Sequence, residues 1–553
     1  MDRREFIKRA GIVVAGASTL SLGGLLAACA QDGAKPNDTG GVGTGTPART
    51  DQVIVVLNAS NEPAAGFDPF FNWGCGEHMH EPLIQSTLIN TTRDMSFVND
   101  LATDYRVSDD ALTWTFTIRD DVRFSDGTKL TARDVAFTLN GIRESEGSET
   151  DLSMVEAVTA PDDSTAVILL NRPFNALLYT LAVVGIVPEA TYSASYGNKP
   201  VGSGRYVLEQ WDKGQQVILT ANPDYYGTPP AMKRVVVLFM QDDAALAAAR
   251  SGQADLASTT ALLANQHVSD YEILACKSVD SRGISLQSKP AGGTKTEGDD
   301  TYALGNDVTS DVAIRRALNY AVDRDALVKN VLNGYGTPAY TVSDGMPWAS
   351  SDMRVKCDPA KAVEILEAAG WMLGTGGIRE KSTGSGTLRA AFDVYHSSSD
   401  TVRQALANEF ANQMRGIGIE VSVKGLSWDD IYPHMYTDPI LWGWGSNSPS
   451  ELYSLYHTEG SSNFADYSNP TVDGYLDAAL QTQEVSQSYP YWKQAQWDGT
   501  TGIGPDGAAT WVWFANIDHL FFKRSNLVVA EQKLHPHGHG WAVLNNVDTW
   551  SWK

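Results

Sequence analysis

The sequence predicts an α/β protein of two or three domains. The chain has 553 residues, more than one hydrophobic core ordinarily contains. Continuous apolar runs at residues 53–57 and 235–239 are typical of strands buried in a sheet. Residues 400–415 instead carry apolar side chains at the spacing of one helix face. Both kinds of element in one chain are compatible with the α/β class.

The first 50 residues have the pattern of an export signal. Arg3 and Arg4 begin an R-R-x-F-x-K motif that is typical of twin-arginine export. An apolar run rich in glycine and alanine follows and ends in Leu-Ala-Ala-Cys, which resembles a bacterial lipobox. We therefore expect residues 1–29 to be a signal that ends at a lipidated Cys29, and residues 30–50 to be a flexible tether. A single transmembrane anchor is the alternative, which the many small residues disfavour.

Charge and cysteine content exclude several classes of protein. The formal net charge is −24 and no basic patch occurs, so nucleic-acid binding is not expected. After the N-terminal run, no stretch is long and apolar enough to span a bilayer. Cys75, Cys276 and Cys357 are odd in number and lack CxxC spacing, so neither a disulfide framework nor a zinc knuckle is supported. One disulfide between two of these three cysteines remains an alternative, and the sequence does not choose the pair.

One segment in the first third of the chain predicts a strand, a turn and a helix in that order. In residues 113–118 large apolar side chains such as Trp114 and Phe116 alternate with threonine, the period of a half-buried strand. A Ser-Asp-Gly sequence then supplies turn chemistry. Thr131 stands three residues before Asp134, as in a helix capping box, and apolar residues follow at helical spacing.

Further elements are predicted in the same way. The alanine-rich residues 243–252 should form a helix that ends at a glycine. Asp358 followed by a proline should begin another helix, which Gly370 closes. Alternating apolar residues at 417–423 predict a strand.

Several stretches resemble family 5 of the solute-binding proteins of ABC importers, the oligopeptide-, dipeptide- and nickel-binding group. The segments that carry the resemblance are His-Glu-Pro-Leu at 80–83, WTFTIR at 114–119, FSDG at 124–127, TARDVAF at 131–137, VGSGRY at 201–206, NPDYYG at 222–227 and RRALNYAVDR at 315–324. They follow one another in the order of the family. The resemblance extends from about residue 53 to about residue 527.

The resemblance implies a periplasmic-binding-protein-like fold of class II, the large three-domain type, with two lobes, mixed sheets and a hinge. Lobe I would comprise residues 51–287, with a subdomain at about 74–200. Lobe II would comprise residues 288–508, and residues 509–553 would return to lobe I. Closure of the lobes over a ligand is the expected working motion.

The resemblance also implies a function. The chain would be a monomeric lipoprotein on the outer face of the bacterial membrane or in the periplasm, anchored through Cys29. It would capture a peptide or peptide-like solute and deliver it to an ABC permease and its ATPase, without a cofactor and without catalysis. Capture of nickel or another metal as a chelate is the alternative. A secreted metal-dependent hydrolase is the alternative from a different class, but no catalytic motif supports it.

The candidate ligand-binding residues are mostly tryptophans. In residues 441–449 glycines leave the backbone accessible, while Trp442 and Trp444 offer flat apolar faces and N–H donors. In the peptide-binding branch an aspartate in this stretch holds the terminal amine of the peptide; here Ser446 and Asn447 take its place, so recognition of a free amine is in doubt. Trp73 completes the set. Tryptophans that only fill the core are the structural alternative. We expect Trp444→Ala to weaken ligand binding at least tenfold, about 1.4 kcal/mol.

Two groups of histidines are weak metal candidates, and no metal site is assigned from them. His78 and His80 would diverge if their segment were helical. His535, His537 and His539 lie in a Pro- and Gly-rich stretch, which predicts a solvated surface loop. The nickel-chelate branch holds its ligand with arginines, and the matching stretches at 145–151 and 183–188 contain none.

Overall fold

The fold was analysed in a computed structural model. It describes residues 50–74, 80–148, 150–298, 300–384, 386–538 and 540–553. The predicted signal and nearly all of the tether, with Arg3, Arg4 and Cys29, lie outside the described residues, as do Cys75, His78 and His539. Residues 51–553 form one unit in the structure.

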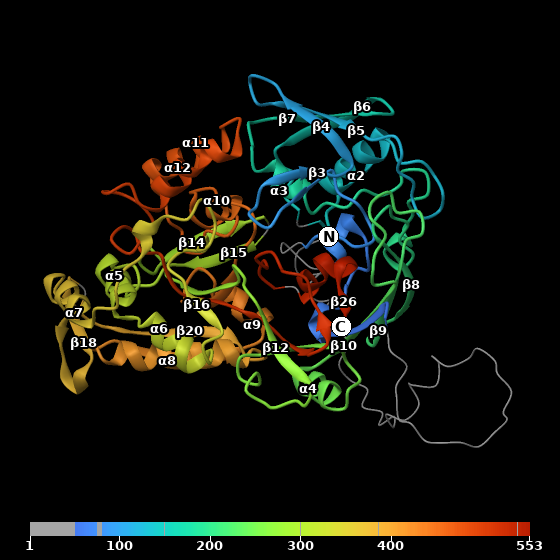
Figure 1. The fold of residues 1–553 in the computed structure, drawn as a ribbon. Coiled ribbons are helices and arrows are strands. Elements are labelled where there is room, and N and C mark those ends of the chain that lie inside the picture. The colour runs from blue at the N-terminus through green and yellow to red at the C-terminus, as the bar shows by residue number, and fades with distance from the viewer. Residues whose placement is uncertain (1–49, 75–79, 149, 299, 385, 539) are drawn as a thin grey trace, which may run out of the picture. The chain divides into compact units, whose positions relative to one another are not determined.

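The largest sheet has seven strands and combines distant parts of the chain (Figure 1). The two apolar runs predicted to be buried strands are confirmed as β1 and β10, which pair in parallel. β1 is also parallel to β11, while the other neighbours are antiparallel, so the sheet is mixed. In sheet order the strands are β12 (Tyr271–Cys276), β24 (His519–Arg524), β11 (Leu256–Thr259), β1 (Gln52–Asn58), β10 (Arg234–Met240), β9 (Gln216–Ala221) and β8 (Tyr206–Asp212).

A four-stranded sheet joins the seven-stranded sheet through two short connections. Its strands, in order, are β16 (Gly336–Pro338), β23 (Trp511–Ile517), β13 (Ser281–Ser285) and β22 (Leu441–Trp444). The chain passes from β12 to β13 through residues 277–280, and from β23 to β24 through Asp518. We call these two connections the crossings. They place the ends of strands from both sheets next to each other.

The strand, turn and helix predicted from residue 113 onwards fold as their sequence predicts. Trp114 and Phe116 are buried on one face of β5, in a four-stranded antiparallel sheet. The capping box is confirmed, because the Thr131 amide donates to Asp134 at 2.7 Å and the Thr131 hydroxyl accepts from the Arg133 amide at 3.3 Å. The elements are β4 (Ala102–Val107), β5 (Thr113–Ile118), β7 (Thr165–Leu170), β6 (Val155–Asp162) and the helix α2 (Ala132–Glu144).

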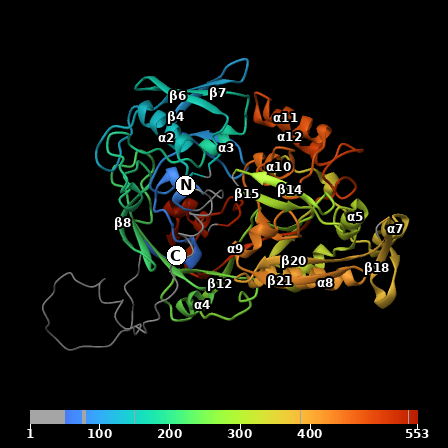
Figure 2. The ribbon, with the colours of Figure 1, turned by 180° about the vertical axis from the view of Figure 1, so that it is seen from behind.

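The predicted helices at 243–252 and after Asp358 are confirmed as α4 and α7, each followed by a glycine in the left-handed region. The predicted strand at 417–423 begins later, at Glu420, and pairs in parallel with β20, and α8 packs against this pair (Figures 1 and 2). Ile417 and Ile419 are buried but precede it, because the turn after α8 occupies 416–419. These elements are α4 (Asp242–Arg250), α7 (Pro359–Ala368), α8 (Thr401–Arg415), β20 (Ala391–Ser397) and β21 (Glu420–Leu426).

The remaining elements surround these sheets. The helices are α3 (Leu177–Leu181), α5 (Val312–Ala321), α6 (Arg324–Ala326), α9 (Trp428–Ile431), α10 (Ser450–Tyr456), α11 (Pro470–Leu480) and α12 (Val485–Gln496). The short strands are β2 (Ile89–Thr91), β3 (Phe97–Asn99), β14 (Gly293–Glu297), β15 (Asp300–Leu304), β17 (Met372–Leu373), β18 (Arg379–Thr383), β19 (Gly386–Arg389), β25 (Leu527–Val528) and β26 (Ser551–Trp552). No helix of the described residues is long and apolar enough to cross a membrane.

The segment before the C-terminus lies along the first crossing, and this corrects one prediction. The Val279 amide donates to the His535 carbonyl at 2.9 Å, and the His535 amide donates to the Lys277 carbonyl at 3.0 Å. The His537 amide donates to the Gly445 carbonyl at 2.6 Å. His535 is only 1% exposed and His537 only 9%. The prediction of a solvated loop is therefore wrong, because main-chain pairing with the crossing holds this segment inside.

Candidate functional site: a cavity at the two crossings

A cavity of about 220 Å³ opens where the two sheets meet. Its walls combine the end of β11, the start of β24 and the first residues of β13 with residues from the region of α8 and β16. We call it the crossing cavity. Ligands of open α/β sheets bind outside the carboxyl ends of the strands, and the cavity lies at that end of β11. The lining residues are 258–261, Asp280, Arg282, Leu332, Tyr335, Val402, 517–521, Gly538 and Gly540.

A buried ion pair forms one wall of this cavity. The Asp280 carboxylate accepts from the Arg282 guanidinium, and the two side chains are 3% and 8% exposed. His519 Nε2 lies 3.0 Å from Asp280 Oδ2, so His519 carries its proton on Nε2. Burial alone would raise the pKa of Asp280, but Arg282 and His537 hold that pKa well below its ordinary value. The carboxylate is therefore charged at neutral pH.

The two buried histidines of the C-terminal segment complete this wall. His537 Nδ1 contacts Asp280 Oδ1, and His535 Nδ1 lies 3.1 Å from His519 Nδ1. Burial lowers the pKa of His537, and burial together with His519 lowers the pKa of His535. With His535 and His537 neutral, the negative charge of Asp280 is balanced by the positive charge of Arg282. The described residues contain no group of three or more acidic, histidine or cysteine side chains placed to hold a metal ion.

A second arginine lies next to the first, beneath Gly443. Arg403 donates to Asp400 at 2.9 Å, and burial beside Arg282 lowers the pKa of Arg403 to about 10, so it stays charged. A Cβ added at Gly443 would lie 2.6 Å from Arg403 Nη2 and 2.7 Å from Arg282 Nη1. Only a glycine lets β22 approach the arginine pair this closely.

Three buried polar atoms of the crossing cavity have no hydrogen-bond partner among the described residues. Arg282 Nε, Ser258 Oγ and Thr259 Oγ1 are inaccessible to solvent and make no hydrogen bond within the described part of the chain. All three belong to residues that line the cavity. Each can donate a hydrogen bond, and a buried donor left without a partner costs about 1–3 kcal/mol. The cavity is thus suited to a ligand group that accepts hydrogen bonds.

The tryptophans singled out from the sequence point away from this cavity. Successive residues of a strand face opposite sides, so Trp442 and Trp444 lie on the face of β22 opposite Gly443. Trp442 stacks on Phe464 with ring centroids 4.6 Å apart, and its Nε1 donates to Ser285 Oγ at 3.0 Å. Both indoles are under 8% exposed and belong to the large aromatic core. Their part in ligand binding stays a prediction.

Ser446 and Asn447 lie in the turn that follows β22. The amides of Gly445 and Ser446 donate to the Glu451 carboxylate at 2.9 and 3.0 Å, so this carboxylate fixes the turn. Asn447 Nδ2 donates to the Leu534 carbonyl at 3.4 Å, and its Oδ1 is buried without a partner among the described residues. Their role as ligand contacts also stays a prediction.

Trp73 and His80 form a separate aromatic group. The His80 ring packs edge-on against Trp73 with centroids 4.7 Å apart, and lies nearly parallel to Trp541 at 5.9 Å. These residues border a small cavity of about 20 Å³ with Pro82, Val183 and Gly185. Because the space is so small, this geometry favours core packing around His80 over a metal site.

We expect the buried His80 to make the protein less stable in mild acid. Burial lowers the pKa of His80 to about 4, against 6.5 when the chain is unfolded. The unfolded state therefore binds the proton first, and stability is lost as the pH falls from 6.5 towards 4. The difference corresponds to about 3 kcal/mol. Urea unfolding at pH 7.5 and at pH 4.5 measures this loss of stability. The free energy of unfolding of His80→Gln should change less between these two pH values than that of the natural protein, and an equal change in the two proteins would contradict the prediction.

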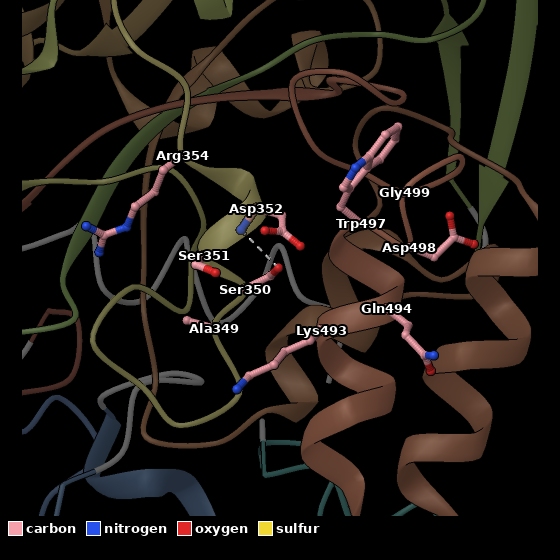
Figure 3. A pocket seen from close by; sticks show the side chains of 10 residues that line it. All are labelled: Ala349, Ser350, Ser351, Asp352, Arg354, Lys493, Gln494, Trp497, Asp498 and Gly499. Carbon is pink, nitrogen blue, oxygen red and sulfur yellow. Dashed lines mark hydrogen bonds between the residues drawn. The ribbon is translucent and has the colours of Figure 1, made fainter.

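An open groove of about 800 Å³ lies elsewhere, between α12 and the 3₁₀ turn at Ser351–Met353 (Figure 3). Figure 3 shows Gln494 and Asp498 pointing to one side and Arg354 to the other. Its lining side chains do not converge on one point. We therefore do not assign a ligand site to it.

The sequence analysis missed Asp280, Arg282 and Arg403. One signal was available, because Asp280, just before β13, and Arg282, within it, stand two residues apart, and the other residues of β13 are small or apolar. Charged residues at that spacing share one face, and a charge is buried in a sheet only when it is paired.

The two described cysteines, Cys276 and Cys357, are free thiols.

Comparison with known proteins assigns the family. The family model described as "Bacterial extracellular solute-binding proteins, family 5 Middle" matches residues 96–466. Protein XP55 of Streptomyces lividans is 34% identical over 489 residues, which cover 84% of each chain. The glutathione-binding protein GsiB of Salmonella typhi is 29% identical over 446 residues, 74% of this chain and 80% of GsiB.

A solved structure agrees with the sequence relatives. NikZ from Campylobacter jejuni in complex with Ni(L-His) superimposes with a TM-score of 0.74 at 25% identity, covering 91% of this chain and 99% of NikZ. The predicted periplasmic-binding-protein-like α/β fold is therefore confirmed. The chain belongs to family 5 of the bacterial extracellular solute-binding proteins, the binding components of ABC importers.

Proposed function

We propose that this protein captures a peptide or peptide-like solute in the crossing cavity and delivers it to an ABC importer. The observation that carries the proposal is the set of three buried donors without partners in the described chain, Arg282 Nε, Ser258 Oγ and Thr259 Oγ1. Peptide carbonyls and carboxylates are acceptors that match them. A relative named as glutathione-binding supports a ligand of this class.

The mechanism is binding followed by closure of two halves about the crossings. Each half would move as a unit, since the chain joins the two sheets only through residues 277–280 and Asp518 in the stretches described. We infer anchoring through a lipidated Cys29 and action as a monomer from the N-terminal motif and the family. No bond is made or broken in the ligand, and ATP would be hydrolysed by the partner subunits.

The direct test is to identify the ligand that accompanies the protein through native purification. Native mass spectrometry of the protein from its own host, followed by denaturation and sequencing of the released compound, should give a peptide or a peptide-like solute. Arg282→Met should retain less of that compound than the matched surface variant Arg93→Met. Recovery of a ligand without peptide character would contradict the proposal.

Capture of a metal chelate is the second candidate, favoured by the likeness to NikZ, whose structure holds Ni(L-His). His519, His535 and His537 border or approach the crossing cavity, but each already has a hydrogen-bond partner. Elemental analysis of the purified protein separates the two candidates. Stoichiometric nickel that is lost together with free histidine would favour the chelate.

Closure has a candidate latch in Asn175. Its amide donates to the Leu480 carbonyl at 3.1 Å and its Nδ2 donates to the Ala479 carbonyl at 2.8 Å, which caps the C-terminal end of α11. In the predicted lobe boundaries, Asn175 belongs to lobe I and α11 to lobe II. We infer that these contacts break when the two predicted lobes separate.

We expect Asn175→Ala to weaken ligand binding about tenfold, or 1.4 kcal/mol, because closure loses these hydrogen bonds. Asn171→Ala is the matched control, since Asn171 bonds to Ser153 within the same predicted lobe. Calorimetric titration with the identified ligand measures the dissociation constants. Equal constants for both variants would remove the latch from the mechanism.

Trp444→Ala tests whether a ligand also contacts the face of β22 opposite the crossing cavity; the expectation from the sequence is at least tenfold weaker binding, about 1.4 kcal/mol. Because Trp444 is only 7% exposed, the change also opens a cavity in the core. Trp492→Ala is the control, since Trp492 is fully buried in α12. Binding is measured for each variant at a temperature where it is folded. Equal weakening in the two variants would assign Trp444 to core packing alone.

A further inference from the structure

A second polar pocket lies in the part of the molecule that contains the seven-stranded sheet. It has a volume of about 440 Å³ and shares no lining residue with the crossing cavity. We call it the side pocket. Its lining residues are Glu81, Pro82, 85–87, Asn90, Thr91, 98–100, Gly204, Arg205, Tyr225, Thr228, Lys533, Asn545 and Asp548. This volume is within the range of small-molecule sites in proteins.

Two buried acceptor atoms of side-pocket residues have no hydrogen-bond partner in the described part of the chain. Gln85 is 1% exposed, and its Nε2 donates to the Phe67 carbonyl at 3.0 Å. A carbonyl can only accept, so this contact fixes which end of the amide is nitrogen. Gln85 Oε1 and Asn545 Oδ1 are both buried and have no hydrogen-bond partner in the described ranges. These two acceptors are suited to a ligand group that donates hydrogen bonds, whereas the orphaned atoms of the crossing cavity are donors.

The side pocket contains three carboxylates but only two cationic side chains. Glu81 pairs with Lys533 and Asp548 with Arg205, and all four side chains are largely buried. Asp100 accepts from the Tyr226 hydroxyl at 2.5 Å, but no lysine or arginine of the described chain lies within 4.0 Å of its carboxylate. Burial raises the pKa of Asp100, although Arg205 and Arg119 at longer range oppose this. A cation in the pocket would stabilise the charged form.

We propose that the side pocket binds a small solute through a primary ammonium group, with Gln85 Oε1 and Asn545 Oδ1 accepting its N–H bonds and Asp100 supplying the opposite charge. An ammonium group offers three donors for the two acceptors and one positive charge for Asp100. A metal ion fits less well, because the described residues contain no group of three or more acidic, histidine or cysteine ligands. This site is independent of the ligand in the crossing cavity.

The test compares methylammonium chloride with tetramethylammonium chloride and sodium chloride at equal ionic strength. Saturation-transfer NMR on the intact protein should detect methylammonium, and the other salts should not displace it. Tetramethylammonium has the same charge but no N–H donor. If it binds equally well, or if methylammonium does not bind, the proposal is overturned.

Variants locate the site. Val98 lines the side pocket and is 44% exposed, so Val98→Trp should close the entrance without disturbing the core. Val312→Trp is the matched control, because Val312 is 37% exposed and lines none of the pockets described above. Asn545→Leu removes one acceptor. We expect about tenfold weaker methylammonium binding in Val98→Trp and Asn545→Leu, and none of this loss in Val312→Trp. Unchanged binding in Val98→Trp overturns the assignment.

Discussion

Gly445→Ala is expected to prevent the protein from folding stably. Gly445 has φ +134°, a conformation that side chains rarely adopt, and a Cβ there would lie 1.7 Å from the Val279 carbonyl oxygen. Val279 belongs to the first crossing, where its amide is bonded to His535, so the backbone cannot withdraw without breaking that pairing. Strain and steric overlap together should cost several kcal/mol, about 3 or more. Thermal unfolding followed by circular dichroism measures the loss.

Gly474→Ala is the matched control for this substitution. Gly474 lies within α11, and a Cβ at this position meets nothing within 4 Å. Alanine is the better helix former there, so the variant should be about 0.5–1 kcal/mol more stable than the natural protein. A Gly445→Ala protein with an unchanged melting temperature would show that the crossing can rearrange, and the account of the first crossing would then be wrong.

Arg282→Met is expected to destabilise the protein by about 3–5 kcal/mol and to abolish ligand binding. The substitution keeps the volume of the side chain but leaves Asp280 buried without its arginine. The nearby histidines would then have to bind protons to supply the missing charge, so the stability of the variant should depend more steeply on pH than that of the natural protein. Urea unfolding and ligand titration measure the two effects.

Arg93→Met controls for the loss of a salt bridge as such. Arg93 pairs with Glu531 at 2.5 Å, but both side chains are about two-thirds exposed, so no measurable change is expected. The double variant Asp280→Asn with Arg282→Met removes both charges and should recover part of the stability. If the double variant is no more stable than Arg282→Met, the cost does not come from the unpaired carboxylate.

Local sequence patterns predicted individual elements well but not their partners. The strands at 53–57 and 235–239, the capped helix α2 and the glycine that ends α4 follow from side-chain period, capping chemistry and φ > 0. These are properties of neighbouring residues. The position of β24 between β12 and β11 does not follow from neighbouring residues, because the partner strands lie more than 240 residues earlier in the chain. Only the family resemblance indicated that the C-terminal part returns to the first half.

The same limit explains what the sequence analysis missed in the site. His535 and His537 are separated by a proline and followed by glycines. Nothing near them in the sequence indicates that they pack beside Asp280. Trp442 and Trp444 were singled out as chemically capable residues, while the glycine between them faces the arginine pair. Period alone places residues on opposite faces of a strand but does not reveal which face is covered by protein and which by ligand.

The return of the C-terminal residues also constrains biosynthesis. β24 is flanked on both sides within the seven-stranded sheet, and β23 is flanked on both sides within the four-stranded sheet. A growing chain that stops before residue 511 lacks an inner strand of both sheets, so it cannot complete either of them on the ribosome. Neither sheet can be completed before residue 524 has been synthesised, and a truncation before residue 511 would leave unpaired strand edges in both sheets, which are prone to aggregation.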